Sequence, residues 1–188
     1  MIHSGRFTAL LDANVLYPAP IRDYLLHLAN LNLYKPKWSS EIHDEWIRNL
    51  LANRPDLSKE ALERTKSAMD SAFPDANVEQ YEELISVIKL PDEDDRHVAA
   101  AAIRGKADVI VTFNLKDFPE NALSTYGIEF QNPDEFISNL INLDKKKCLK
   151  ALENQVKSLK NPPRSREEVL ETLTNCGLEK SVDLLKDI

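Results

Sequence analysis

DEDDRHVAAAAIRGKADVIVTFNLKDFP, residues 92–119, is the stretch that decides the fold. Its alanine run has high intrinsic helix propensity, and the acids before the run suit a helix N-terminus. Gly105 is well placed to end this helix. ADVIVTF (107–113) follows; it is short, rich in β-branched residues and not alternating, which is typical of a parallel strand buried on both faces. The stretch therefore predicts a helix followed at once by a buried strand.

The segments on either side repeat this alternation. FTALLDA (7–13) predicts a buried strand that ends at Asp12, and IEF (128–130) predicts a last edge strand. The remaining predicted elements are helices at 21–34, from Ser39 or Ser40 to Pro55, at 57–73, at 78–85 and at 134–143, with a short strand at 35–38. Alternating strands and helices predict a three-layer α/β/α fold with a parallel central sheet, in which sites form at the carboxyl ends of strands.

The last 45 or so residues have a different character. DKKKCLKALENQVKSLKNPP (144–163) is basic and helical, and two short helices split at Gly177 are expected after it. Ser165 with Glu168 three residues on predicts a capping box. We expect a main domain over residues 1–142 and a helical C-terminal extension over residues 143–188.

Bulk composition narrows the class of protein only coarsely. The chain has 188 residues, 43% of them hydrophobic and 29% charged, which suits a globular protein. The net charge of −7 argues against nucleic-acid binding through broad charge alone, although cations can offset a local acidic cluster. Two cysteines, no signal-peptide pattern and no long apolar run lead us to expect a cytoplasmic location.

Acidic residues occur at four places that a parallel sheet would bring together. They are Asp12 after the first strand, Glu45 on the helix that begins near Ser40, the run Asp92–Asp95, and Asp117 after the strand exit. Each alone has an ordinary explanation as a turn residue, a helix cap or an exposed side chain. Together they match the hard oxygen ligands that Mg²⁺ prefers, and two such ions about 4 Å apart can promote phosphodiester hydrolysis.

With these acids in this order, the chain resembles the PIN-domain ribonucleases, and among them the VapC-type toxins of toxin–antitoxin pairs. The resemblance covers roughly residues 6–142 and lies in LLDANVLY, SSEIHDEW, the stretch 92–119 and IEFQNPDEFI, in that order. Its most specific part is an Asp before the alanine-rich helix, followed by a strand that ends V-T-x-N-x-x-D-F. The resemblance implies the same α/β/α fold.

The resemblance also implies a set of site residues. The catalytic and metal-binding acids would be Asp12, Glu45, Asp95 and Asp117, with Asp92 as a helper ligand. At the helix position Asp44 or Glu41 competes with Glu45. Asn114 is a departure, because many relatives have an acid there. Asn14, Thr112 and Asn114 would support the acids by hydrogen bonding.

The implied activity is metal-dependent endonucleolytic hydrolysis of RNA with Mg²⁺ or Mn²⁺ as cofactor. A PIN nuclease that acts on DNA, or on structured ribosomal or transfer RNA, is an alternative. An RNA substrate, a cognate antitoxin and a homodimer are the expected partners, and no membrane is. A catalytically weak PIN-like module that only binds a partner is the alternative, which the neutral Asn114 favours slightly. A phosphatase of the haloacid dehalogenase type is disfavoured, because Asn14 replaces the second acid of its D-x-D motif.

Other residues near the acids carry weaker expectations. His43 and His97 are near enough in sequence to be ligands, but nitrogen ligands suit zinc better than Mg²⁺. Trp38 and Trp46 are expected in the core, with base stacking as the alternative. The basic side chains Arg96, Arg104, Lys106 and Lys116 are equally consistent with phosphate contacts and with a solvated surface.

Overall fold

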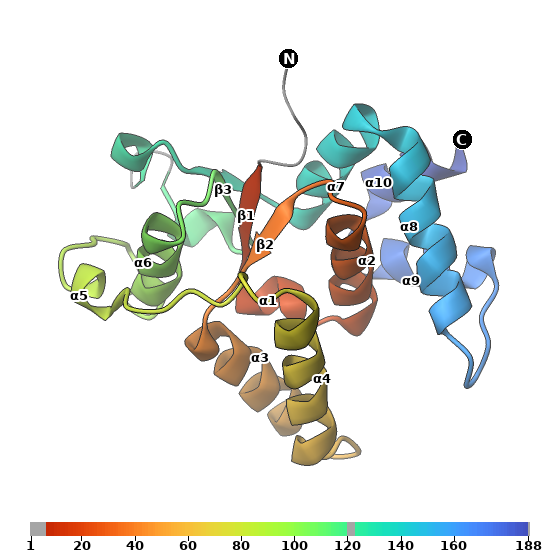
Figure 1. Ribbon diagram of the computed structural model, residues 1–188, viewed down its shortest axis with the longest axis horizontal. Coiled ribbons are helices and arrows are strands. Elements are labelled where there is room, and N and C mark those ends of the chain that lie inside the picture. The colour runs from red at the N-terminus through yellow and green to blue at the C-terminus, as the bar shows by residue number, and fades with distance from the viewer. Residues whose placement is uncertain (1–6, 120–122, 188) are drawn as a thin grey trace. The chain divides into compact units, whose positions relative to one another are not determined.

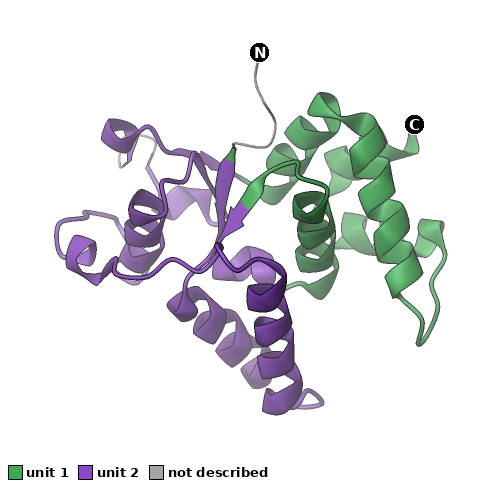
Figure 2. Cartoon of the chain, viewed as in Figure 1, with its two compact units in different colours: residues 1–7, 18–35, 132–188 green, residues 8–17, 36–131 purple. Residues whose placement is uncertain are grey.

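The computed structural model describes residues 7–119 and 123–187, and it divides the chain into two compact units. The first consists of residues 1–7, 18–35 and 132–188, and the second of residues 8–17 and 36–131 (Figure 2). The domain boundary expected between residues 142 and 143 stays a prediction. Its two spans also include residues 1–6, 120–122 and 188, which lie outside the described residues.

The sheet is the centre of the second unit (Figure 1). Within the described residues its strands follow the order β2 (Lys35–Lys37), β1 (Thr8–Leu11), β3 (Val109–Val111), β4 (Glu129–Gln131). β1 pairs in parallel with β3, with Leu10 opposite Ile110, and β3 pairs in parallel with β4. The central strands β1 and β3 are buried throughout, as unalternating apolar strands require. A mixed α/β protein with a parallel central sheet is therefore confirmed.

The described part of the second unit also contains helices. They are α1 (Ala13–Leu16), α3 (Ser40–Asn53), α4 (Lys59–Ala72), α5 (Glu82–Ile85) and α6 (Arg96–Arg104), with the 3-10 helices η2 (Leu115–Asp117) and η3 (Ser124–Tyr126). α6 packs on β1 and β3 through the alanine run, whose four side chains are fully buried. Small side chains let the helix lie close to the sheet, which brings its N-terminal residues to the strand ends.

The first unit is helical. It contains α2 (Ala19–Asn30), α7 (Pro133–Leu143), α8 (Lys145–Ser158), α9 (Arg166–Asn175) and α10 (Glu179–Lys186). α2 packs on α8 and α9, and the Gln155 amide donates to the Pro20 carbonyl oxygen over 2.9 Å. The capping box of Ser165 and Glu168 is present as predicted. The C-terminal helices thus share a core with α2, which lies more than a hundred residues earlier in the chain.

Several boundaries differ from the sequence prediction. The helix predicted over 78–85 begins only at Glu82, and the strand predicted over 107–113 spans only Val109–Val111. The helix predicted over 21–34 ends at Asn30, because Asn32 adopts a left-handed conformation with φ of 57° that a helix cannot continue through. The strand predicted over 7–13 ends at Leu11, because the Asp12 carboxylate accepts a hydrogen bond from the Ala13 N–H and starts a short helix instead. No helix in the described part of the chain has the length and apolar character needed to cross a bilayer.

Candidate metal centre

Asp12 stands at the carboxyl end of β1 and is held by three hydrogen bonds. Its Oδ1 accepts from the Ala13 N–H over 2.6 Å. Its Oδ2 accepts from the Asn14 amide and from the Thr112 hydroxyl, each over 2.7 Å. The side chain is only 3% exposed. Burial raises the pKa of Asp12 more than the Thr112 hydrogen bond lowers it, and the charge of Glu45 raises it further.

Asn14 and Thr112 join the ends of β1 and β3 into one network. Besides binding Asp12, the Asn14 amide nitrogen lies 3.0 Å from the Thr112 hydroxyl, and its carbonyl oxygen accepts from the Phe113 N–H over 3.0 Å. The Thr112 hydroxyl in turn accepts from the Asn114 N–H over 3.0 Å. Every donor in this network is neutral. The network therefore fixes the position of Asp12 without adding a positive charge.

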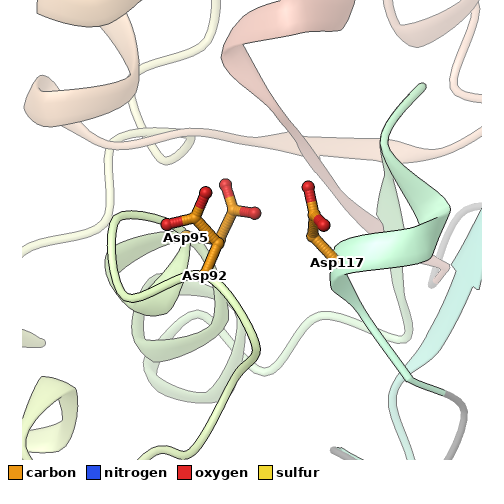
Figure 3. Close-up of side chains that lie close together, drawn as sticks. All are labelled: Asp92, Asp95 and Asp117. Atoms are coloured by element: carbon orange, nitrogen blue, oxygen red, sulfur yellow. The ribbon is translucent and has the colours of Figure 1, made fainter.

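Asp92, Asp95 and Asp117 form the tightest group of possible ligands among the described residues. One carboxylate oxygen from each lies within 4.8 Å of the other two. Asp92 and Asp95 rise from the segment that leads into α6, and Asp117 rises from η2 (Figure 3). The sequence resemblance implied that Asp92 is only a helper ligand. The structure gives it an equal place in this group, from a loop before the helix.

The carboxylate of Asp95 is surrounded by other acids and, in the described part of the chain, lacks a hydrogen-bond donor for one of its oxygens. Its Oδ2 is buried and has no hydrogen-bond partner among the described residues, although Asp95 occupies the N-cap position of α6. Burial and the charges of Asp12, Asp92, Asp117 and Glu45 raise the pKa of Asp95 to about 6. A buried carboxylate oxygen without a donor is costly. A divalent cation bound by the three acids would remove this cost, so the residues present fit a hard cation.

Asp117 is oriented by Asn114, the residue that the sequence comparison with PIN-domain ribonucleases singled out. The Asn114 amide donates a hydrogen bond to Asp117 Oδ2. Position 114 therefore contributes a neutral donor to the site, in place of another carboxylate. Its backbone is tied to the Asp12 network through Thr112.

Glu45 stands apart from the tightest group but close to it. Its charge raises the pKa values of both Asp12 and Asp95. Glu45 Oε2 lies 3.5 Å from His97 Nε2, and Glu41 Oε2 lies 3.7 Å from His97 Nδ1, which is ion-pair range but too long for a good hydrogen bond. Burial lowers the pKa of His97, but Glu45 and Glu41 outweigh burial, so its pKa is raised. α3 thus directs two acids at one buried imidazole.

His97 is the residue near the site that sequence reasoning set aside. Its signal was its position two residues after Asp95, within the first turn of the alanine-rich helix. His43, the other candidate, belongs to the core. Its Nδ1 accepts from the Trp46 indole N–H over 2.9 Å, and its Nε2 lies 3.3 Å from Asp70 Oδ1.

These features define a class of protein: an α/β protein with a parallel sheet whose strand ends carry a cluster of carboxylates suited to a divalent cation. The chain belongs to the PIN domain family, because the PIN domain profile matches residues 8–116. A second profile, the VapC50 C-terminal domain, matches residues 133–187. The first match contains Asp12, Glu45, Asp92 and Asp95, and it ends one residue before Asp117.

A curated relative also matches. "Putative ribonuclease VapC50" of Mycobacterium tuberculosis (strain ATCC 25618 / H37Rv) is 39% identical over 79 residues, which cover 42% of this chain and 47% of that protein. The chain thus spans about half the length of the curated relative that it matches. No solved structure matches the chain.

Proposed function

We propose that this chain is a metal-dependent endoribonuclease that hydrolyses RNA phosphodiester bonds and acts as the toxin of a toxin–antitoxin pair. Membership of the PIN domain family and similarity to a protein named as a VapC ribonuclease support this function. The site supplies the chemical reason, because carboxylates that gather at strand ends can hold a cation beside a phosphate.

The cofactor of the proposed enzyme is Mg²⁺ or Mn²⁺. Asp92, Asp95 and Asp117 would hold it, with Asp12 and Glu45 completing the acidic site. When bound, such a cation supplies Lewis-acid charge that stabilises the developing negative charge and makes water more acidic. The buried Oδ2 of Asp95 without a hydrogen-bond partner is the observation that carries this proposal.

The other residues of the site act by positioning. Asn14 and Thr112 keep the Asp12 carboxylate turned toward the acidic site, and Asn114 does the same for Asp117. Glu45 is proposed as a catalytic acid whose orientation depends on His97. Fixed carboxylates need no reorganisation when the substrate arrives, which favours catalysis.

The test is Mn²⁺-dependent cleavage of a mixed pool of single-stranded RNA by the wild type, by Asp12→Asn and by Asp75→Asn. Asp75 is an exposed acid outside the site, so its variant is the matched control. We expect cleavage by the wild type and the control and at least a 100-fold loss in Asp12→Asn. Equal cleavage by all three proteins would show that a contaminant or another site is responsible. No cleavage by any would favour the binding module.

We further infer that a cognate antitoxin binds the acidic site with a cationic group. The excess of carboxylates, and the raised pKa of Asp95 that results from it, favour an arginine or a helix with basic side chains as the inserted element. Copurification of a partner with the chain, and its release when Asp92 and Asp117 are changed to Asn, is the expected result. We also propose that the chain forms a homodimer and that residues 143–188 form a helical extension separate from the nuclease domain.

A further inference from the structure

Phe113 is an exposed aromatic residue between Thr112 and Asn114, whose side chains bond to acids of the site. In the described residues 7–119 and 123–187, only Phe113 and Tyr126 are aromatic side chains with large exposure, at 41% and 52%. Trp38 and Trp46, which the sequence offered as candidates for base stacking, are fully buried. Their indole N–H groups bond to Asp70 and His43, so both belong to the core.

The position of Phe113 distinguishes it from an ordinary exposed apolar residue. Isolated apolar side chains are common on protein surfaces and need no explanation. Phe113, however, follows Thr112, whose hydroxyl binds Asp12, and precedes Asn114, whose amide binds Asp117. Consecutive Cα atoms are about 3.8 Å apart, so the backbone of Phe113 lies between the residue that binds Asp12 and the residue that binds Asp117.

The backbone beneath the ring is fixed on both sides. The Phe113 N–H donates to the Asn14 side-chain oxygen over 3.0 Å, and the next N–H donates to the Thr112 hydroxyl over 3.0 Å. The same network that orients Asp12 therefore also orients the main chain of Phe113. A ring on a fixed backbone loses little conformational freedom when a flat ligand binds it.

The neighbouring charges fit a nucleotide. A ligand whose phosphate is held at the acidic cluster by a cation has its base one sugar away, and an aromatic face is the usual partner of an unpaired base. Lys116 is exposed on the same β3–η2 segment and can contact a further phosphate. Stacking requires a base that is free of its duplex, so this arrangement selects single-stranded nucleic acid.

We propose that Phe113 is the base-stacking platform of the site and that it binds the base beside the phosphate held at the Asp92–Asp95–Asp117 cluster. This inference rests on the proposed nuclease function, and it adds a specificity determinant to that function. Phe113 would act on substrate affinity and strand choice, while the acids act on the reaction itself.

The experiment measures binding of a fluorescent 12-residue single-stranded oligoadenylate and of the same sugar-phosphate chain without bases. Both are bound to Asp12→Asn protein in Mn²⁺, so that cleavage does not interfere. Phe113→Ala should weaken oligoadenylate binding about 5- to 100-fold and leave binding of the abasic chain unchanged. Phe113→Trp should restore binding, and Phe113→Leu should not, because an apolar side chain without a π-face cannot stack.

Tyr126→Ala is the matched control, because it removes the other exposed aromatic side chain. It should leave oligoadenylate binding unchanged. Equal loss of binding to both oligonucleotides in Phe113→Ala, or full binding by Phe113→Leu, would overturn the stacking platform. Unchanged melting temperatures of all the variants exclude misfolding as the cause.

Cleavage by the otherwise wild-type enzyme separates this inference from the proposed function. Phe113→Ala should raise KM for single-stranded RNA and leave kcat within about threefold, because stacking binds ground state and transition state alike. A wild type that cleaves RNA, with a Phe113→Ala variant of the same KM, overturns the inference and leaves the function standing. A wild type that binds through Phe113 but cleaves nothing supports the platform and overturns the nuclease.

Discussion

The two corners of the acidic site hold their carboxylates in opposite ways. At the Asp12 corner, hydrogen bonds from Ala13, Asn14 and Thr112 satisfy a buried carboxylate with neutral donors. At the Asp95 corner, one buried oxygen has no donor among the described residues, and other acids surround it. The first corner is complete without a cation, whereas the second gains most from one. We therefore propose that the Asp12 corner serves positioning and that the Asp95 corner serves metal binding.

Removing the charge of Asp95 should have the largest effect, which is on the stabilisation of the fold by Mn²⁺. In wild type, Mn²⁺ at a hundredfold excess over its Kd should stabilise the fold by about 2.7 kcal/mol. We expect Asp95→Asn to lose most of this stabilisation, as measured by urea unfolding with Mn²⁺ and with EDTA. Asp94→Asn, an exposed acid next to it in the chain, is the control and should keep it. The same Mn²⁺ stabilisation in both variants would end the distinction between the two corners.

Removing one donor at the first corner should have a smaller effect on catalysis and almost none on metal binding. Thr112→Val keeps the side-chain shape but deletes the hydroxyl that binds Asp12 and accepts from Asn114. We expect the cleavage rate to fall about 10- to 100-fold, with the Mn²⁺ affinity changed much less. Thr65→Val, which removes a hydroxyl bonded within α4, is the matched control. A loss of Mn²⁺ affinity as large as the loss of rate would show that the Asp12 corner also takes part in metal binding.

In the metal-free protein, the free energy of unfolding should depend on pH because of the carboxylate of Asp95. Because the folded-state pKa of Asp95 is raised to about 6 from 3.8, the folded state binds more protons than the unfolded state between about pH 4 and 6. The free energy of unfolding in EDTA should therefore fall as pH rises through this window. Asp95→Asn should exceed wild type in stability by about 1 kcal/mol at pH 7.5, after discounting for partial exposure, and by nothing near pH 4. A constant difference across this range would contradict the raised pKa.

Converting Asn114 to an acid should have the smallest effect. Asn114→Asp removes the amide donor to Asp117 and adds a like charge, so the metal-free fold should lose about 0.5–1 kcal/mol. Mn²⁺ should reverse this loss, because the new carboxylate is a further ligand. Asn114→Ala, which removes the donor without adding charge, should lose stability with no recovery in Mn²⁺. Identical behaviour of the two variants in unfolding titrations would show that position 114 does not reach the cation.

The sequence predicted best those features that depend on local patterns. The unalternating run at 107–113 contains the buried β3, the alanine run forms α6, and Ser165 with Glu168 forms the capping box. These features need only residues close in the chain, which is why composition and spacing reveal them. The end of α2 was predicted too late, because Leu33 and Tyr34 continue the apolar spacing although they are buried outside the helix.

The residue types of the candidate site were predictable from the sequence, but which of these side chains lie next to one another was less so. Resemblance supplied Asp12, Glu45, Asp95 and Asp117. It did not indicate that Asp92 groups more tightly with Asp95 and Asp117 than Asp12 does, because that depends on how a loop turns before α6. The placement of His97 near Glu41 and Glu45 also depends on where α3 lies relative to α6, which no spacing in either helix encodes.

The bond between Asp12 and Thr112 has a consequence for synthesis of the chain. The two residues are a hundred positions apart, so Asp12 enters the growing polypeptide long before the hydroxyl that steadies it. A nascent or prematurely terminated chain that stops before β3 contains Asp12, Glu45, Asp92 and Asp95 but lacks the strand that pairs with β1. Such a fragment lacks the β1–β3 pairing and the Thr112 hydroxyl that holds Asp12. The hydrogen bond that holds Asp12 can therefore form only after more than half of the chain has been made.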